Sequence, residues 1–185
     1  MISFYYMYTL EIQPQTKMSE ILQNYPSARR VLFQKYHIGG CNSCGYSLND
    51  TIEKVFIKHN KLPYLQEAIQ LIYDSVKLER SFQIAPKELS HLLEEEKDWI
   101  LLDVRDAMER EIANISGSLW LTQELAWEIL QKWNKQTKMV FFCHTGIRSL
   151  EATYFFYFKG FPNVKNLDGG IKRWAEEVDP SIPIY

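Results

Sequence analysis

The sequence predicts an α/β domain with a parallel sheet, residues 79–185, preceded by a small all-helical domain, residues 1–78. Apolar residues recur at helical spacing through the first part, whereas the second part alternates short apolar runs with helical patterns. Strands alternating with helices indicate a parallel sheet, because parallel neighbours need a crossover connection. A short charged stretch at 76–81 separates the two patterns and is the expected boundary.

The composition is that of a folded, soluble protein, since 46% hydrophobic residues can fill a core. The net charge is −2 without a block of Lys and Arg, so no nucleic-acid partner is expected. The first 15 residues are rich in aromatics and contain no Lys or Arg. That pattern is neither a secretory signal nor long enough to cross a bilayer, so we expect an extended segment, no membrane association and a cytoplasmic location.

Four helical segments are expected in the first domain. The first, around 21–25, ends before Pro26, and the second, around 31–38, stops at Gly39–Gly40, since glycine commonly follows a helix C-terminus. A third runs through 52–56 with Asn49 or Asp50 as its cap, and a fourth runs from about 63 to 76.

The second domain shows five strand patterns, at 82–84, 99–102, 115–121, 139–142 and 164–167. Helices are expected from Pro86 onward and at 125–133, 146–159 and 171–177. The runs at 99–102 and 139–142 are continuously apolar, as in strands covered on both faces.

Cys143 stands where chemistry is expected, at the carboxyl end of a buried strand and just before a helix. Backbone N–H groups of the loop, the helix N-terminus and Arg148 would stabilise a thiolate and lower the pKa of Cys143. Gly146 permits the tight turn, and Thr145 and Ser149 can add hydroxyl donors. A lone cysteine is often only an inert core residue, but Cys, Gly, Arg and a helix start in this order favour a nucleophile.

Three separated motifs carry a family resemblance: WILLDVRDAMEREIANISGSLWL, FFCHTGIRS and FPNVKNLDGGIKRWAEE. Over nearly all of residues 82–185 the chain resembles the rhodanese domain. The resemblance implies a parallel five-stranded sheet flanked by helices. It also implies that Cys143 accepts a sulfane sulfur from thiosulfate or a persulfide and passes it to a thiol acceptor, with no cofactor. Asn114 departs from the family, which often has histidine at that position.

The same resemblance assigns roles around the loop. The backbone from His144 through Thr145, Gly146 and Ile147 to Arg148 would hold the transferred sulfur. His144 is the weakest of these candidates, since it could equally be an exposed loop residue. Asp103 and Arg105 would lie beside the loop as supporting residues, with Arg105 paired to Glu109.

The main competing interpretation of the loop is that it belongs to a cysteine phosphatase. Those enzymes place five residues between cysteine and arginine, whereas only the four residues 144–147 lie between them here. No separate general acid is identifiable, so phosphatase activity is not expected. An arsenate-reducing variant of rhodanese chemistry stays open, because arsenate is also an oxyanion and a dithiol is present.

Cys41 and Cys44 form a second candidate site, with two residues between them. The pair could be a redox dithiol that accepts sulfur from Cys143, part of a metal site, or a structural disulfide or idle thiol pair. Even with His37 the ligands number only three, so no complete metal site is expected in one chain. Residues 9–77 resemble the small helical paired-cysteine domain associated with hybrid-cluster proteins; a similar module begins certain iron–sulfur repair proteins.

The sequence therefore predicts a rhodanese-type sulfurtransferase, with the Cys41/Cys44 dithiol as a candidate acceptor. Two alternatives stay open. The chain could be a sulfur carrier that acts with a sulfur- or iron–sulfur-handling protein in metal assembly or repair. It could also be a thiol redox sensor in which Cys143 exchanges disulfides with the pair.

Overall fold

The computed structural model describes residues 10–39 and 45–185 of the chain. The chain divides into two units, Met1–Arg80 and Ser81–Tyr185. No helix within the described ranges is long and apolar enough to span a membrane.

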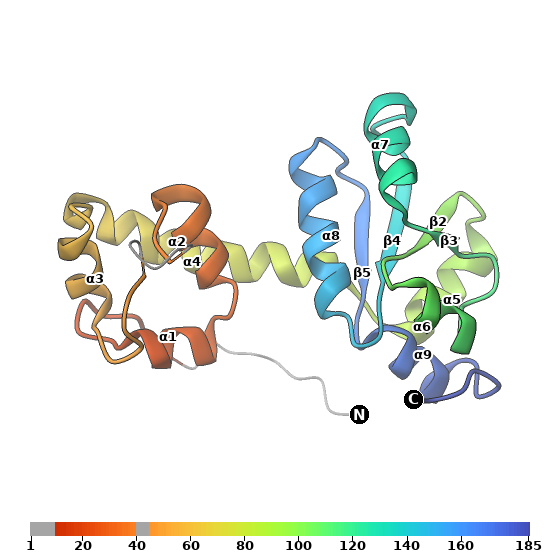
Figure 1. Ribbon diagram of the computed structural model, residues 1–185, viewed down its shortest axis with the longest axis horizontal. Helices are drawn as coiled ribbons and strands as arrows, with labels where there is room; N and C mark the ends of the chain where they lie inside the picture. The colour runs from red at the N-terminus through yellow and green to blue at the C-terminus, as the bar shows by residue number, and fades with distance from the viewer. Residues whose placement is uncertain (1–9, 40–44) are drawn as a thin grey trace. The chain divides into compact units, whose positions relative to one another are not determined.

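The first unit is built from helices around one apolar core (Figure 1). They are α1 (Met18–Asn24), α2 (Ala28–Tyr36), α3 (Ile52–Lys58), the 3-10 turn η1 (Leu62–Tyr64) and α4 (Leu65–Phe82). Fully buried side chains from four of these helices meet there: Met18, Ile21, Leu32, Phe56 and Ile72. The expectation of a helical N-terminal region is confirmed.

Three details of the first unit differ from expectation. Helix α2 ends at Tyr36 because His37 takes the left-handed conformation, φ 57°, and turns the buried Ile38 into the core. Helix α3 is capped by Thr51, whose hydroxyl accepts from the N–H of Lys54, and not by Asn49 or Asp50. Helix α4 extends beyond its expected end near 76, because its apolar spacing continues to the buried Phe82; the division between the two units, after Arg80, falls within its last turn. Cys41, Cys44 and residues 1–9 of the extended segment expected over the first 15 residues lie outside the described residues.

The second unit contains a five-stranded parallel sheet with strand order β1-β5-β4-β2-β3. Its strands are β1 (Gln83–Ile84), β2 (Trp99–Asp103), β3 (Leu119–Trp120), β4 (Lys138–Phe142) and β5 (Val164–Leu167). Its helices are α5 (Pro86–Glu95), α6 (Ala107–Ile112), α7 (Gln123–Lys132), α8 (Ile147–Phe158) and α9 (Gly170–Glu177). The predicted fold class, a five-stranded parallel sheet flanked by helices, is confirmed.

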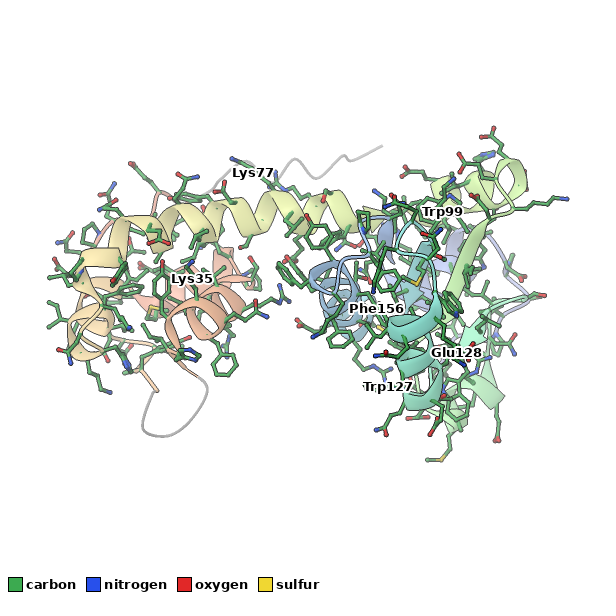
Figure 2. All side chains as sticks on the ribbon, turned by 90° about the horizontal axis from the view of Figure 1, so that it is seen from above. Lys35, Lys77, Trp99, Trp127, Glu128 and Phe156 are labelled. Carbon is green, nitrogen blue, oxygen red and sulfur yellow. The ribbon has the colours of Figure 1, made fainter. Side chains whose placement is uncertain are left out.

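Helices cover both faces of this sheet (Figure 1). On one face Val140 and Phe142 of β4 share a core with Leu89 of α5 and Trp174 of α9. Figure 2 shows Phe156 of α8 against the opposite face, where its ring stacks on Phe141 at 5.0 Å. Successive side chains of β4 thus enter different layers, which explains why the whole strand is apolar.

Three details from Phe82 onward differ from expectation. Strand β3 covers only Leu119–Trp120 of the expected 115–121, because its pairing with β2 extends only over Leu102 and Asp103. Helix α6 was not expected, although Asp106 and Glu109 form a capping box that starts it. Phe82, expected in the first strand, ends α4 instead.

Candidate functional site

The candidate nucleophile follows the central strand of the sheet. Strand β4 pairs with β2 through Asp103 and Phe142, and with β5 through Phe141 and Asn166, so both neighbouring strands end beside Cys143. Ligand sites of open α/β folds lie at this carboxyl edge. The chain then crosses 144–146 and enters α8 at Ile147.

Gly146 shapes the loop. It takes a left-handed conformation, φ 88°, and a Cβ there would lie 3.0 Å from the backbone oxygen of Leu167. An L-residue would therefore meet both an unfavourable backbone conformation and the neighbouring strand. The close approach directs the Gly146 N–H at the Cys143 sulfur, with 3.1 Å between N and Sγ.

The environment of Cys143 favours the thiolate. Burial acts most strongly and would raise the pKa of this thiol, whose residue is only 1% exposed. Hydrogen bonds from the Ser149 hydroxyl, 3.4 Å from Sγ, and from the N–H groups of Ser149, Thr145 and Gly146 outweigh burial. The net effect lowers the pKa, as expected for a loop whose donors converge on one sulfur.

Arg148 is held by Glu109 of α6. Its Nη2 and Nη1 atoms donate to Oε1 and Oε2 of that carboxylate at 2.6 and 2.7 Å. The hydrogen bonds from Arg148 lower the pKa of Glu109 to about 2, and the pair raises the pKa of Arg148. The expected pairing of Arg105 with Glu109 is therefore wrong: Arg105 reaches only the backbone oxygen of Glu109, at 3.3 Å, because Arg148 occupies the carboxylate.

The two supporting residues form a buried ion pair next to the loop. Asp103 and Arg105 have no exposed side-chain surface, and Nη2 of Arg105 lies 2.7 Å from Oδ2 of Asp103. The same oxygen accepts from Arg110 at 2.9 Å, and Oδ1 accepts from Nε and the backbone N–H of Arg105. Arg105 also donates to the backbone oxygen of Ala113 at 2.7 Å. This network fixes the segment between β2 and α6 and thus the position of Glu109.

Tyr185 links this network to the loop. Its hydroxyl accepts from Nη1 of Arg105 at 2.7 Å and lies 3.4 Å from Oε1 of Glu109. Its ring lies 4.6 Å from the ring of His144, which is half-buried. Tyr185 was not predicted as part of the site, because its partner Arg105 lies 80 positions earlier in the sequence and no local motif links the two. The role of Glu109 could have been suspected from the Asp-x-x-Glu capping box.

The other predicted loop residues differ in exposure. Thr145 and Ile147 are exposed, whereas Gly146 and Ser149 are buried. A groove of about 620 Å³ lies on the Arg148 side of the loop, with Arg105, Asp106, Trp120, Thr122 and Glu124 among its other lining residues. In the part of the chain that the structure describes, no three His, Cys, Asp or Glu side chains are grouped so as to hold a metal ion.

Comparisons with known proteins find relatives of the second unit. Residues 85–177, just over half of the 185-residue chain, match the family described as "Rhodanese-like domain". The "Probable adenylyltransferase/sulfurtransferase MoeZ" of Mycobacterium tuberculosis is 32% identical over 114 residues, which cover 60% of this chain and 29% of that protein. The "Rhodanese-like/PpiC domain-containing protein 12, chloroplastic" of Arabidopsis thaliana is 37% identical over 89 residues, 46% of this chain and 30% of that protein.

Among solved structures, "Human Single Domain Sulfurtranferase TSTD1" is 26% identical, with a TM-score of 0.45, and the match covers 52% of this chain and 96% of that one. The present chain spans less than a third of the length of the two curated relatives above.

Proposed function

Because the chain belongs to the rhodanese-like domain family, we propose that it is a sulfurtransferase in which Cys143 carries sulfur as a persulfide. One observation carries the proposal. Cys143 directly follows the central strand β4, and its sulfur accepts hydrogen bonds from the Gly146 N–H and the Ser149 hydroxyl. A thiol that is buried yet stabilised as a thiolate is a nucleophile and not merely a packing residue. The MoeZ relative, which is named as a sulfurtransferase, supports the same chemistry.

In the proposed reaction the Cys143 thiolate attacks the outer sulfur of the donor. A bond forms between Sγ and that sulfur, and the donor's own bond to it breaks. The leaving group departs as sulfite from thiosulfate, or as a thiolate from a persulfide. An acceptor thiolate then attacks the outer sulfur of the Cys143 persulfide and regenerates Cys143. No oxidant is needed, because the sulfane sulfur moves without a net change in oxidation state.

The loop backbone would stabilise the charge on the transferred sulfur. The N–H groups directed at Sγ come from the turn 145–149, where α8 begins. Such donors favour anionic sulfur without reorganising during the reaction. His144 to Arg148 are thus proposed as the sulfur-binding loop, and Asp103 and Arg105 as residues that position it.

The proposal extends to the first domain, residues 1–78, which we propose acts on sulfur carried by the second, residues 79–185. Its resemblance to paired-cysteine domains supports Cys41 and Cys44 as a candidate acceptor dithiol. Attack by one of these thiolates would yield a persulfide on that cysteine, and attack by the other would release sulfide and leave a disulfide. A sulfur- or iron–sulfur-handling protein is the alternative acceptor.

Intact-mass spectrometry of the reduced protein after exposure to thiosulfate or a low-molecular-weight persulfide tests both parts. Wild type and the Cys41→Ser/Cys44→Ser variant should each gain one sulfur atom, whereas Cys143→Ser should gain none. Slower loss of the adduct from the double variant would support the dithiol as acceptor. Equal rates of loss would favour a separate protein acceptor.

Absence of an adduct on every version would contradict the sulfurtransferase proposal. A disulfide between Cys143 and Cys41 or Cys44 under mild oxidation, without an adduct, would instead favour the thiol redox alternative.

A further inference from the structure

The charge at the mouth of the Cys143 loop is balanced within the protein. Arg148 is the only Arg or Lys within the loop 143–149, and half of its side-chain surface is exposed. Both of its terminal nitrogens donate to Glu109 at 2.6 and 2.7 Å. Arg148 also interacts with the Cys143 thiol, and the Glu109 carboxylate offsets the positive charge that Arg148 presents there to an incoming anion.

Glu109 is well fixed in this arrangement. Its backbone N–H donates to Asp106 at 2.9 Å in the capping box of α6, and the Tyr185 hydroxyl lies 3.4 Å from Oε1. Only 18% of its side-chain surface is exposed. The carboxylate therefore keeps its charge and position beside Arg148, consistent with its strongly lowered pKa.

The remaining charges of the adjoining groove do not restore positive potential. Arg105 shares the buried carboxylate of Asp103 with Arg110, so these three groups together carry one net positive charge. Asp106 and Glu124, which also line the groove, are in no ion pair with any residue that the structure describes. The approach to the loop is thus neutral to negative, which opposes a dianion more than a neutral molecule.

We propose that Glu109 is a specificity-determining residue, which by neutralising Arg148 directs the enzyme away from dianionic thiosulfate and toward an alkyl persulfide, whose reacting form R–S–SH is uncharged, as its sulfur donor. The inference rests on the proposed sulfurtransferase function and names the donor of that site. The Cys143 thiolate attacks the terminal sulfur of R–S–SH. The new S–S bond forms while the R–S to S bond breaks, and the products are Cys143–S–SH and R–S⁻.

The test measures the second-order rate constant of persulfide formation on Cys143 with each of two donors. The donors are thiosulfate and the persulfide of 2-mercaptoethanol, which has no ionisable group other than its S–SH group. Glu109→Gln keeps an oxygen for Arg148 but removes the negative charge. It should raise the thiosulfate constant about tenfold, as expected for one unit charge near a dianion in water-like surroundings. The constant for the alkyl persulfide should change less than about twofold. Glu111→Gln, an exposed glutamate on the same helix, should change neither.

A measurement on wild type alone keeps the inference testable if Glu109→Gln does not fold. If the approach to the Cys143 loop is neutral to negative, the second-order rate constant with thiosulfate should rise or stay level as the ionic strength increases, because salt screens repulsion. A fall with salt would mean that free positive charge attracts the donor and would overturn the inference. So would a Glu109→Gln variant that leaves the ratio of the two constants unchanged. If wild type takes sulfur from neither donor, the sulfurtransferase proposal itself fails.

Discussion

Removing the negative charge of Asp103 should destabilise the second unit more than any comparable change on its surface. In Asp103→Asn, the amide oxygen can take the place of Oδ1 and still accept from the N–H and Nε of Arg105, at 3.0 and 2.9 Å in wild type. The amide nitrogen would then replace Oδ2. It would face two donors, Nη2 of Arg105 and Nη1 of Arg110, which wild type binds at 2.7 and 2.9 Å.

The magnitude follows from these contacts. Two charge-assisted hydrogen bonds are lost, each worth roughly 1.5–3 kcal/mol. The buried guanidinium of Arg105 also loses its counter-ion, and breaking a buried pair by removing one partner typically costs about 3–5 kcal/mol. The hydrogen bonds give roughly 3–6 kcal/mol and the broken pair about 3–5 kcal/mol, so we expect a loss of roughly 3–5 kcal/mol in the free energy of unfolding of the second unit.

Tryptophan fluorescence during urea unfolding is the appropriate assay, because all five tryptophans lie in the second unit. Two of them, Trp99 and Trp127, are labelled in Figure 2. Asp98→Asn is the matched control, since Asp98 is 64% exposed and pairs with Lys138 at the surface; its unfolding midpoint should match wild type. A loss under about 1 kcal/mol in Asp103→Asn would refute the reasoning and show that the buried arginine finds compensation elsewhere.

Three further outcomes are expected. Ser149→Ala removes a hydroxyl donor to Sγ, so the pKa of Cys143 should rise and the midpoint of iodoacetamide alkylation should move to higher pH; an unchanged midpoint would leave the backbone as the sole cause. Gly170→Ala should destabilise the second unit by more than about 2 kcal/mol in the same fluorescence assay, because its Cβ would lie 2.4 Å from the backbone oxygen of Cys143; wild-type stability would contradict that contact. Since the pKa of Glu109 is lowered from 4.5 to about 2, its contribution to stability is present above pH 4.5 and is lost as the pH falls toward 2. Glu109→Gln should therefore flatten the acid side of the stability profile, and an unchanged profile would assign that dependence to other carboxylates.

Much of the second unit could be predicted from the sequence because its signals are local. The apolar runs at Trp99 and Met139 mark strands covered on both faces, and Pro86 marks a helix start within one turn. The same holds for the loop, where a strand end, a glycine and a helix start lie within a few residues of Cys143. By contrast, the charged residues at 76–81 suggested that the preceding helix ends near 76, yet the apolar residues of that stretch continue the helical spacing of α4 to Phe82.

The sequence by itself determined the fold class, the position of the candidate nucleophile and the glycine that shapes its loop, because backbone preference and apolar periodicity act over a few residues. Only the tertiary structure decided which carboxylate neutralises which arginine. Glu109 binds Arg148, 39 positions away, while Arg105 turns back to Asp103 and reaches Tyr185, 80 positions away. Coulombic attraction depends on the distance between charges in space and not on their separation in the sequence. Charge partners are therefore selected by the distances that folding creates and cannot be predicted from a motif.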